Sequence, residues 1–119
     1  MSYDIDLTDP ITGSVLKLDG KHHMQGGTYQ VGGTINLSLN ITYNYSKHYC
    51  RVLDGEKGIR FIYGMTGAES LPVLKKAIDE LGDDTTEDYW EPTEGNAKAA
   101  LLQLHAMATM RPDGVWIGD

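Results

Sequence analysis

Apolar and polar residues alternate most regularly between Ile35 and Ser46, in the run INLSLNITYNYS. Apolar or aromatic residues occupy every second position, and the positions between them carry only amides and hydroxyls. This alternation predicts a half-buried β-strand along the whole run. Asparagine is a poor strand residue, so the uncharged polar row favours a ligand-binding surface or a buried polar seam. An ordinary solvated strand face with a turn near Asn44 is the plainer alternative.

Two further β segments are predicted at the ends of the chain. Ile5 and Leu7 alternate with polar residues, the turn-forming run DPITG covers residues 9–13, and apolar residues resume at 15–18. This order predicts a β-hairpin. The closing run GVWIGD, residues 114–119, predicts a strand beside that hairpin.

A Gly-Gly-Thr triplet occurs at residues 26–28 and again at 32–34. Paired glycines permit positive φ and close backbone approach. The segment is therefore either a loop whose amides contact a ligand or a short strand at 28–31 between two tight turns. No Gly-Lys-Ser/Thr sequence follows, which argues against a phosphate-binding loop of the Walker type.

Helical spacing dominates the second half of the chain. Apolar residues recur at helical intervals over 70–81, which predicts a helix with Ser70 as its N-cap and Gly82 after its last residue. A second helix is predicted from Thr93 to about residue 110, where Pro112 ends it.

Two shorter segments precede these helices. Ser46 is a plausible N-cap for a short helix that extends to Leu53. The apolar run from Gly58 to Tyr63 is too short for periodicity to distinguish a helix from a strand.

These elements predict an α+β fold in a single domain, residues 1–119. The sheet is small and mostly antiparallel, built from the N-terminal hairpin, the 35–45 strand and the C-terminal strand, and two to three helices pack on one face. The 119 residues, 40% of them apolar, suffice for one modest core.

The net charge of −7 is concentrated in one segment. Residues 79–94, DELGDDTTEDYWEPTE, carry eight acidic residues and no Lys or Arg. Such a segment repels nucleic acid, so direct DNA or RNA binding is not expected, although a basic partner could be attracted. A solvated acidic loop that aids solubility is the simplest interpretation.

Nothing in the sequence predicts a membrane span or a signal peptide, and the single Cys50 predicts no disulfide. We therefore expect a cytoplasmic protein. His48 and Cys50 have the spacing H-x-C, but no second ligand pair accompanies them, so no metal or other cofactor is predicted. No nucleophile motif such as G-x-S-x-G is present, and an enzyme is not expected.

Tyr89 and Trp90 interrupt the acidic segment with two large aromatic residues. They are either fixed in the core or left as a stacking surface for a planar ligand. The cations close enough in sequence to assist an anionic ligand are Lys21, Lys47, Arg51 and Arg60.

The order of motifs resembles a group of small proteins encoded by bacteriophages and prophages. The resemblance is carried by DPITG, the N-x-T-x-N turn into a short helix, GIRFIYGMTG, YWEPTEGNAKAAL and the closing PDGVW. It covers nearly the whole chain but implies no activity and no catalytic residue. It implies a setting in the cytoplasm of a bacterial host, where small acidic accessory proteins of phages often inhibit host defence.

From these features we predict a non-enzymatic phage or prophage protein that sequesters a small polar ligand, with a nucleotide-derived host defence signal as one candidate. The predicted ligand-binding residues are Asn40, Thr42, Tyr43, Asn44, Tyr45, Trp90 and Asn96. The alternative is an inhibitor that binds a host defence enzyme, in the manner of anti-CRISPR proteins, through Asp83, Asp84, Glu87 and Asp88.

A homo-oligomer is also predicted. Ala97, Ala100 and Ala108 share one face of the last helix and allow close approach of a neighbour, and the core of so short a chain is small.

Overall fold

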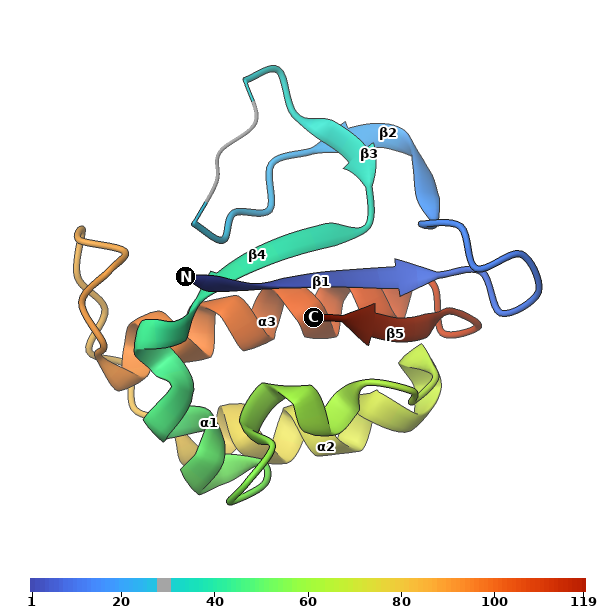
Figure 1. The fold of residues 1–119 in the computed structure, drawn as a ribbon. Coiled ribbons are helices and arrows are strands. Elements are labelled where there is room, and N and C mark those ends of the chain that lie inside the picture. Colours follow the sequence, from blue (N-terminus) through green and yellow to red (C-terminus); the bar gives the residue numbers. More distant parts are fainter. Residues whose placement is uncertain (28–30) are drawn as a thin grey trace.

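The computed structural model describes residues 1–27 and 31–119. Within these residues the chain forms a three-stranded sheet, a two-stranded ribbon, three α-helices and two short 3₁₀-helices (Figure 1). The elements in chain order are β1 (Ser2–Thr8), β2 (Lys17–His22), β3 (Thr34–Asn36), β4 (Ser38–Thr42), η1 (Tyr43–Tyr45), α1 (Ser46–Val52), η2 (Gly58–Ile62), α2 (Gly67–Glu80), α3 (Glu94–Met110) and β5 (Val115–Gly118).

The three-stranded sheet has the order β4-β1-β5, and both pairings are antiparallel. Ile5 at the centre of β1 lies opposite Leu39 of β4 and Gly118 of β5. The three α-helices lie on one side of this sheet, and the β2–β3 ribbon lies on the other (Figure 1). The predicted α+β class is confirmed, and the C-terminal strand lies beside β1 as expected.

The predicted N-terminal hairpin is confirmed at its turn, but its second strand is wrong. Residues 9–13 do form a turn, in which Asp9 N–H donates to Ser14 O at 2.8 Å. After this turn the chain pairs with β1 at the Thr8–Val15 bridge, next to which Leu16 N–H donates to Leu7 O. The next strand, β2, leaves the sheet and pairs with β3 instead.

The single strand predicted from Ile35 to Ser46 is also wrong. The run is divided into β3 and β4 at Leu37, whose backbone bonds to Leu7 and Leu16, and extended structure ends at Thr42. Residues 43–45 form η1, and Tyr45 is buried from that turn rather than from a strand. Alternation reports which residues are buried, and a 3₁₀ turn can bury the same residue that a strand would.

Helix α2 begins earlier than the sequence suggested. Thr66 and Glu69 form a capping box, with Glu69 N–H donating to Thr66 Oγ1 at 3.1 Å and Thr66 N–H donating to Glu69 Oε1 at 2.9 Å. Ser70, the predicted N-cap, is instead buried inside the helix, where its hydroxyl accepts the Trp116 Nε1 proton at 2.8 Å. The T-x-x-E signature was present in the sequence and was the stronger start signal.

The remaining helices largely match the predictions. Thr93 caps α3, and α1 covers the expected residues, but Ser46 is its first helical residue and not its cap. The segment whose type periodicity left open, Gly58 to Tyr63, forms the 3₁₀-helix η2. The short strand predicted at 28–31 falls on residues 28–30, outside the described part of the chain.

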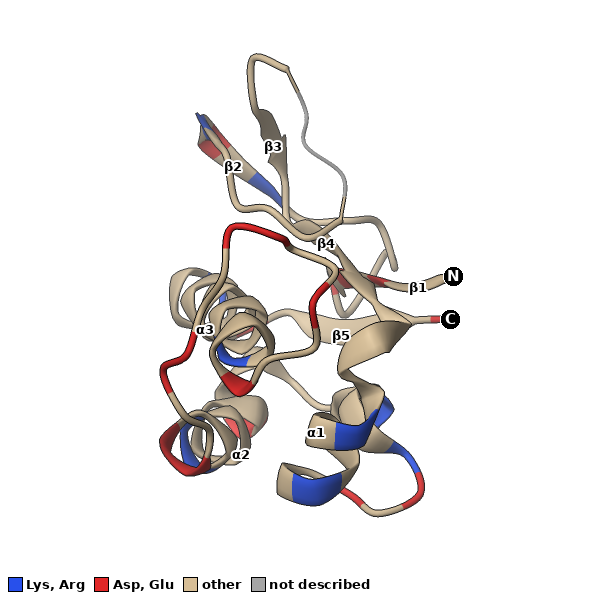
Figure 2. Ribbon diagram, turned by 90° about the vertical axis from the view of Figure 1, so that its left-hand side faces the viewer, with Lys and Arg blue, Asp and Glu red and all other residues tan. Residues whose placement is uncertain are grey.

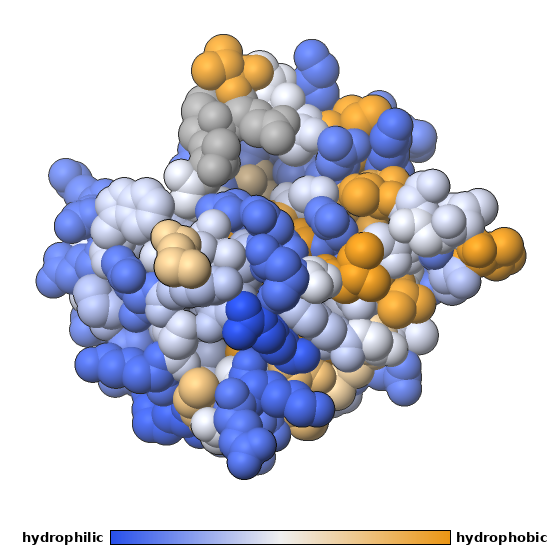
Figure 3. All heavy atoms as spheres, viewed as in Figure 1, coloured by the Kyte–Doolittle hydropathy of each residue, from blue (hydrophilic) through white to orange (hydrophobic). Residues whose placement is uncertain are grey.

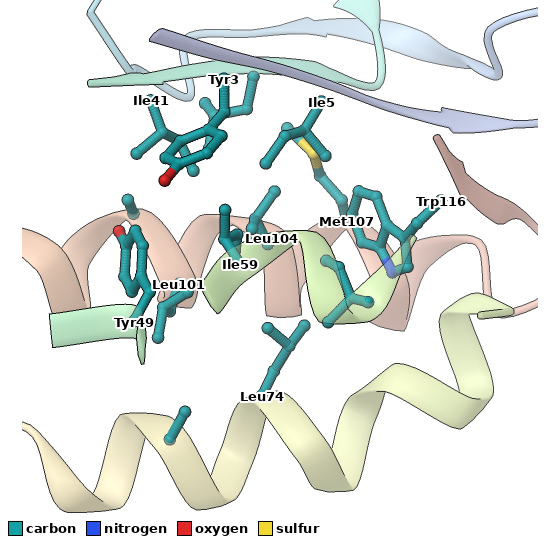
Figure 4. Close-up of a cluster of buried hydrophobic side chains, with 14 of the residues drawn as sticks. Tyr3, Ile5, Ile41, Tyr49, Ile59, Leu74, Leu101, Leu104, Met107 and Trp116 are labelled. Carbon is teal, nitrogen blue, oxygen red and sulfur yellow. The ribbon is translucent and has the colours of Figure 1, made fainter. Parts of the chain in front are cut away.

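The core lies between the inner face of the sheet and the helices. Tyr3, Ile5 and Ile41 point from the sheet toward Leu104 and Met107 of α3 (Figure 4). Trp116 closes this layer from β5 and is fully buried. None of the helices in residues 1–27 and 31–119 combines the length and the apolar character needed to cross a bilayer.

Candidate ligand-binding site

Asn40, at the centre of the predicted polar row, lies on the outer face of β4. Its Nδ2 donates to Ser2 Oγ and to Asp4 Oδ1, both at 2.6 Å. A side-chain amide has two N–H donors, so both are used within the chain. Its Oδ1 faces Gly27, where an added Cβ would lie 2.8 Å from that oxygen. Asn40 therefore orients Asp4 and holds a neighbouring loop.

Thr42 and Asn44 do not continue the row as a flat surface. Thr42 is buried, and its hydroxyl accepts the Asn44 N–H at 3.2 Å, which caps η1. The Asn44 side chain donates to Trp90 O at 2.9 Å. Both residues turn the chain and attach it to the acidic segment, so in this structure they act as a structural seam.

Tyr43 and Tyr45 lie in different surroundings. The Tyr43 ring packs on Tyr3 with 4.5 Å between centroids, and Arg60 lies over both rings and donates to the Tyr43 hydroxyl at 3.0 Å. Tyr45 is buried, and its hydroxyl donates to Tyr89 O. Arg60 is therefore engaged with tyrosine rings on a surface apart from Tyr45.

Tyr89 closes the free edge of β4. Its hydroxyl accepts the Thr42 backbone N–H at 2.8 Å, so a side chain supplies the acceptor that a further strand would have provided. The ring packs edge-on against Tyr45, with 5.6 Å between centroids. Of the two aromatic residues in the acidic segment, Tyr89 is the one fixed against the core.

Gly26 and Gly27 cover the same edge of β4 next to Tyr89. Gly27 N–H donates to Asn40 O at 2.8 Å. A Cβ at Gly26 would overlap the Asn40 carbonyl group, so only glycine permits this approach. The first Gly-Gly pair is therefore a point of backbone contact with β4, which neither of the two sequence interpretations specified.

Asn96 fixes the acidic segment to the start of α3. Its Nδ2 lies within hydrogen-bond distance of Thr86 Oγ1, Asp88 O and Glu91 O, and its Oδ1 accepts the Thr86 N–H at 3.0 Å. The side chain is thus fully used within the chain, although the residue lines a pocket.

The acidic side chains of the segment differ in their contacts. Asp83 forms an ion pair with Lys98 at 2.6 Å, Asp84 accepts the Gly95 N–H at the start of α3, and Asp88 accepts the Trp90 N–H.

Glu87 and Glu91 are exposed and make no side-chain hydrogen bond or ion pair within the described residues. Figure 2 shows the acidic residues along the loop between α2 and α3. Three of the four predicted partner-binding residues, Asp83, Asp84 and Asp88, therefore make contacts within the chain, and Glu87 is the exception.

Trp90 is 52% exposed and is not a core anchor. Its ring packs edge-on against Tyr89 with 5.0 Å between centroids, and an added Cβ at Gly27 would lie 3.4 Å from its Cη2 atom. The indole is held at the surface between the acidic segment and the glycine loop.

The larger cavity, which we call the outer pocket, lies between the outer face of β1 and β4 and the end of the β2–β3 ribbon. Its volume is about 250 Å³. It is lined by Asp4, Ile5, Asp6, His22, His23, Met24, Gly26, Thr34, Ser38, Leu39 and Asn40.

A second cavity, the loop pocket, lies on the other side of Gly26, between α3 and the acidic segment. Its volume is about 200 Å³. It is lined by Gln25, Gly26, Tyr45, Thr86, Glu87, Tyr89, Asn96, Ala99, Ala100 and Gln103. The Gln103 Oε1 atom is buried and has no hydrogen-bond partner among residues 1–27 and 31–119.

The two pockets contain only part of the predicted set. Asn40 lines the outer pocket, and Tyr45 and Asn96 line the loop pocket. Thr42, Tyr43, Asn44 and Trp90 are not among the lining residues of either.

The tyrosine hydroxyls near the loop pocket remain protonated. Burial raises the pKa of Tyr45, with a smaller effect from Tyr89, and burial also raises the pKa of Tyr49. Burial raises the pKa of Tyr89 as well, although the bond from the Thr42 N–H opposes the shift. These groups therefore stay neutral, and the Tyr45 and Tyr49 protons are already donated to the Tyr89 and Ala97 carbonyl oxygens.

Sequence reasoning missed Asp4, Asp6, His22 and Gln103 as lining residues. The polar positions of β1 were visible as alternation with Ile5 and Leu7, but nothing local indicated that a ribbon would cover them. His22 is positioned by the β2–β3 ribbon and the residues that follow it: Nε2 bonds to Asn36 O of β3 at 2.6 Å, and Nδ1 accepts the Met24 N–H at 3.3 Å.

Within the described residues, no group of three or more His, Cys, Asp or Glu side chains is placed to hold a metal ion. The alanines on which the oligomer prediction rested, Ala97, Ala100 and Ala108, are buried within the chain itself, so they offer no surface to a neighbour. No family model matches the chain, and no curated protein and no solved structure shows significant similarity to it.

Proposed function

We propose that this chain is a non-enzymatic binding protein that sequesters a small polar ligand at the two pockets beside Gly26. The main observation behind this proposal is that each pocket is lined by a polar side-chain group without a hydrogen-bond partner in the described residues. Gln103 Oε1 in the loop pocket is buried and unpaired, and the Asp6 carboxylate in the outer pocket has no hydrogen bond or ion pair within the described residues. A buried polar atom without a partner, such as Gln103 Oε1, costs about 1–3 kcal/mol, and a ligand that bonds to it removes that cost.

The charges of the residues that line the two pockets restrict the kinds of ligand that fit. No Lys or Arg is among the residues described as lining either pocket. Of the cations considered from the sequence, Arg51 is paired with Glu94 and Arg60 lies over Tyr3 and Tyr43. A nucleotide-derived signal with several phosphates would find no counter-charge here, so a neutral or cationic ligand is the better fit. Action in the cytoplasm of a phage-infected bacterium is part of the proposal and rests on the resemblance.

The test is to identify what the protein captures. The chain is purified under native conditions from bacteria during phage infection, the protein is denatured, and the released small molecules are measured by mass spectrometry. We expect one compound in near-stoichiometric amount with the wild type and with Gly20→Ala, because an added Cβ at Gly20 meets nothing within 4 Å. Gly26→Ala should lose it. If no compound copurifies with the wild type, the proposal fails.

The alternative, an inhibitor that binds a basic protein surface, is favoured by Trp90. A half-exposed tryptophan beside unpaired carboxylates resembles the aromatic centre and charged rim of many interfaces. The test leaves Asp83 and Asp84 unchanged, because both attach the acidic segment to α3. Glu87→Gln with Glu91→Gln removes two charges that make no contact in the described chain, and slower association with a basic partner would support inhibition.

A further inference from the structure

The loop pocket is lined by a side-chain amide that has no partner at either end. The Gln103 Oε1 atom is buried and unpaired, and the Gln103 Nε2 atom makes no hydrogen bond within the described residues either. A carboxamide holds one acceptor beside two N–H donors. Its last torsion is broad and two-fold, and no partner fixes it here, so the group can turn to direct either atom into the pocket. Gln103 can therefore offer a donor and an acceptor side by side.

Four other polar side chains of the lining already use their protons within the chain. The Thr86 hydroxyl donates to a backbone oxygen at 3.0 Å, and the Asn96 Nδ2 atom lies within hydrogen-bond distance of three oxygen atoms. The Tyr45 hydroxyl donates to Tyr89 O, and the Tyr89 hydroxyl lies 3.5 Å from Asn40 O. These groups shape the pocket and leave the recognition of a ligand to other residues.

Gln25 and Glu87 are the remaining polar side chains of the lining. Both are exposed, and neither makes a hydrogen bond or ion pair within residues 1–27 and 31–119. Glu87 is the single charged residue among the described lining residues, so a phosphate group would meet a like charge and no cation. The surface is mainly hydrophilic on the left-hand side of the view in Figure 3, where the acidic segment lies. The ligand that fits is polar but carries no negative charge.

The shape of the loop pocket limits the ligand to one ring system. Four lining residues lie at i, i+3, i+4 and i+7 on one face of α3: Asn96, Ala99, Ala100 and Gln103. The small alanine side chains leave space beside Gln103, and the rings of Tyr45 and Tyr89 add aromatic surface to the lining. A volume of about 200 Å³ holds about seven water molecules at ~30 Å³ each, and it is below the roughly 300–1,000 Å³ of pockets for drug-sized ligands.

We infer that the loop pocket binds an uncharged purine ring, as a free base or a nucleoside, through paired hydrogen bonds to Gln103. This inference rests on the proposed function and specifies the ligand class for one of its two pockets. Adenine carries the N6 amino donor beside the N7 acceptor, and a glutamine amide bonds to this pair in a bidentate manner. Hypoxanthine carries a donor and an acceptor in the reverse order, at N1 and O6, and an amide that can turn over is complementary to it as well.

The experiment compares three neutral probes of one size with the intact chain by isothermal titration calorimetry: 9-methyladenine, 9-methylhypoxanthine and 9-methylpurine. The third probe has ring nitrogens that accept hydrogen bonds but no donor beside them. We expect each of the first two to bind at least about tenfold more tightly than 9-methylpurine, because each makes both hydrogen bonds. Adenosine that binds at least as tightly as 9-methyladenine would support a nucleoside ligand, and weaker adenosine would support a free base.

Gln103→Met keeps the length of the side chain and removes both hydrogen-bonding atoms. It should weaken the binding of 9-methyladenine by at least about tenfold and leave that of 9-methylpurine unchanged. Leu102→Met is the matched control, because Leu102 is the preceding residue of α3, is 49% exposed and lines neither pocket. This variant should bind all three probes like the wild type. If Gln103→Met alters the circular dichroism spectrum, Ala99→Leu provides a second test, since it fills the pocket from α3 and should abolish binding.

Several results would overturn the inference. They are equal affinity for 9-methyladenine and 9-methylpurine, no binding of either substituted purine at about millimolar concentration, and equal losses in the Gln103 and Leu102 variants. AMP that binds about tenfold or more tightly than adenosine would contradict an uncharged ligand. A compound without a purine ring, released from the purified protein, would also overturn the inference, while the proposed function would stand.

Discussion

The two faces of the three-stranded sheet are built from the same strands and have opposite roles. On β1 the inner residues Tyr3, Ile5 and Leu7 are buried against the helices, whereas Asp4 and Asp6 between them line the outer pocket. The inner face is held by many interchangeable apolar contacts. The outer face and the free edge of β4 are held by a few specific contacts, such as the Asn40 side chain to Asp4 and the Gly27 N–H to Asn40 O.

This difference separates folding stability, which depends on the inner face of the sheet, from ligand binding, which we assign partly to the outer face. Apolar burial is roughly proportional to area and tolerates changes of partner. Polar contacts depend on individual atoms, so the outer face can lose its function at little cost to folding. The four predictions below test this separation, from the largest expected change in stability to the smallest.

Ile5→Ala should reduce the free energy of unfolding by about 2–5 kcal/mol, because it removes a fully buried side chain from the inner face. Asp6→Asn, at the next position of the same strand, should change it by less than about 0.5 kcal/mol. Urea denaturation followed by circular dichroism measures both. Similar losses for the two variants would mean that the outer face also supports the fold.

Asn96→Ala should cost about 1–3 kcal/mol, because it leaves the backbone groups of Thr86, Asp88 and Glu91 without their shared partner. Amide hydrogen exchange should increase across residues 86–91. Asn44→Ala is the control, since its exposed side chain makes a single bond to Trp90 O. If exchange in the acidic segment rises equally in both variants, Asn96 is not what orders it.

Gly26→Ala should cost roughly 1 kcal/mol, the lower end of overpacking costs, because the loop can move away from β4 to relieve the overlap with Asn40. The expected signature is a loss of amide protection at Gly27, whose N–H donates to Asn40 O. Gly20→Ala introduces the same methyl group into open space and should leave that protection intact. Retained protection in Gly26→Ala would contradict the close approach.

Trp90→Ala should change the free energy of unfolding least, by less than about 1 kcal/mol, because half of the side chain is already exposed. Trp116→Ala, at the buried tryptophan, should cost about 3–5 kcal/mol. Thermal unfolding compares the two. A large loss at Trp90 would identify it as an anchor of the acidic segment, whereas lost ligand binding at unchanged stability would identify a stacking surface.

Local chemistry in the sequence was sufficient for the helices, the 9–13 turn and the membership of the core. Leu74, Leu101 and Leu104 are buried and lie at the helical spacing of apolar residues that predicted the two helices, and Thr93 marked the start of α3. Such signals act over a few residues, so they survive whatever the rest of the chain does. The α+β class follows from them.

The tertiary structure decided which strands pair and which residues come together in the pockets. Alternation shows that a strand has a buried face, but it does not identify the neighbour, so β1 could be assigned to a hairpin when it pairs with β4 and β5. Likewise, the polar row was visible, but whether a polar atom binds a ligand depends on which distant groups reach it. Asn40 is used by Ser2 and Asp4 and Asn96 by residues 86–91, whereas Asp6 keeps an unpaired carboxylate because no cation of the described chain reaches it.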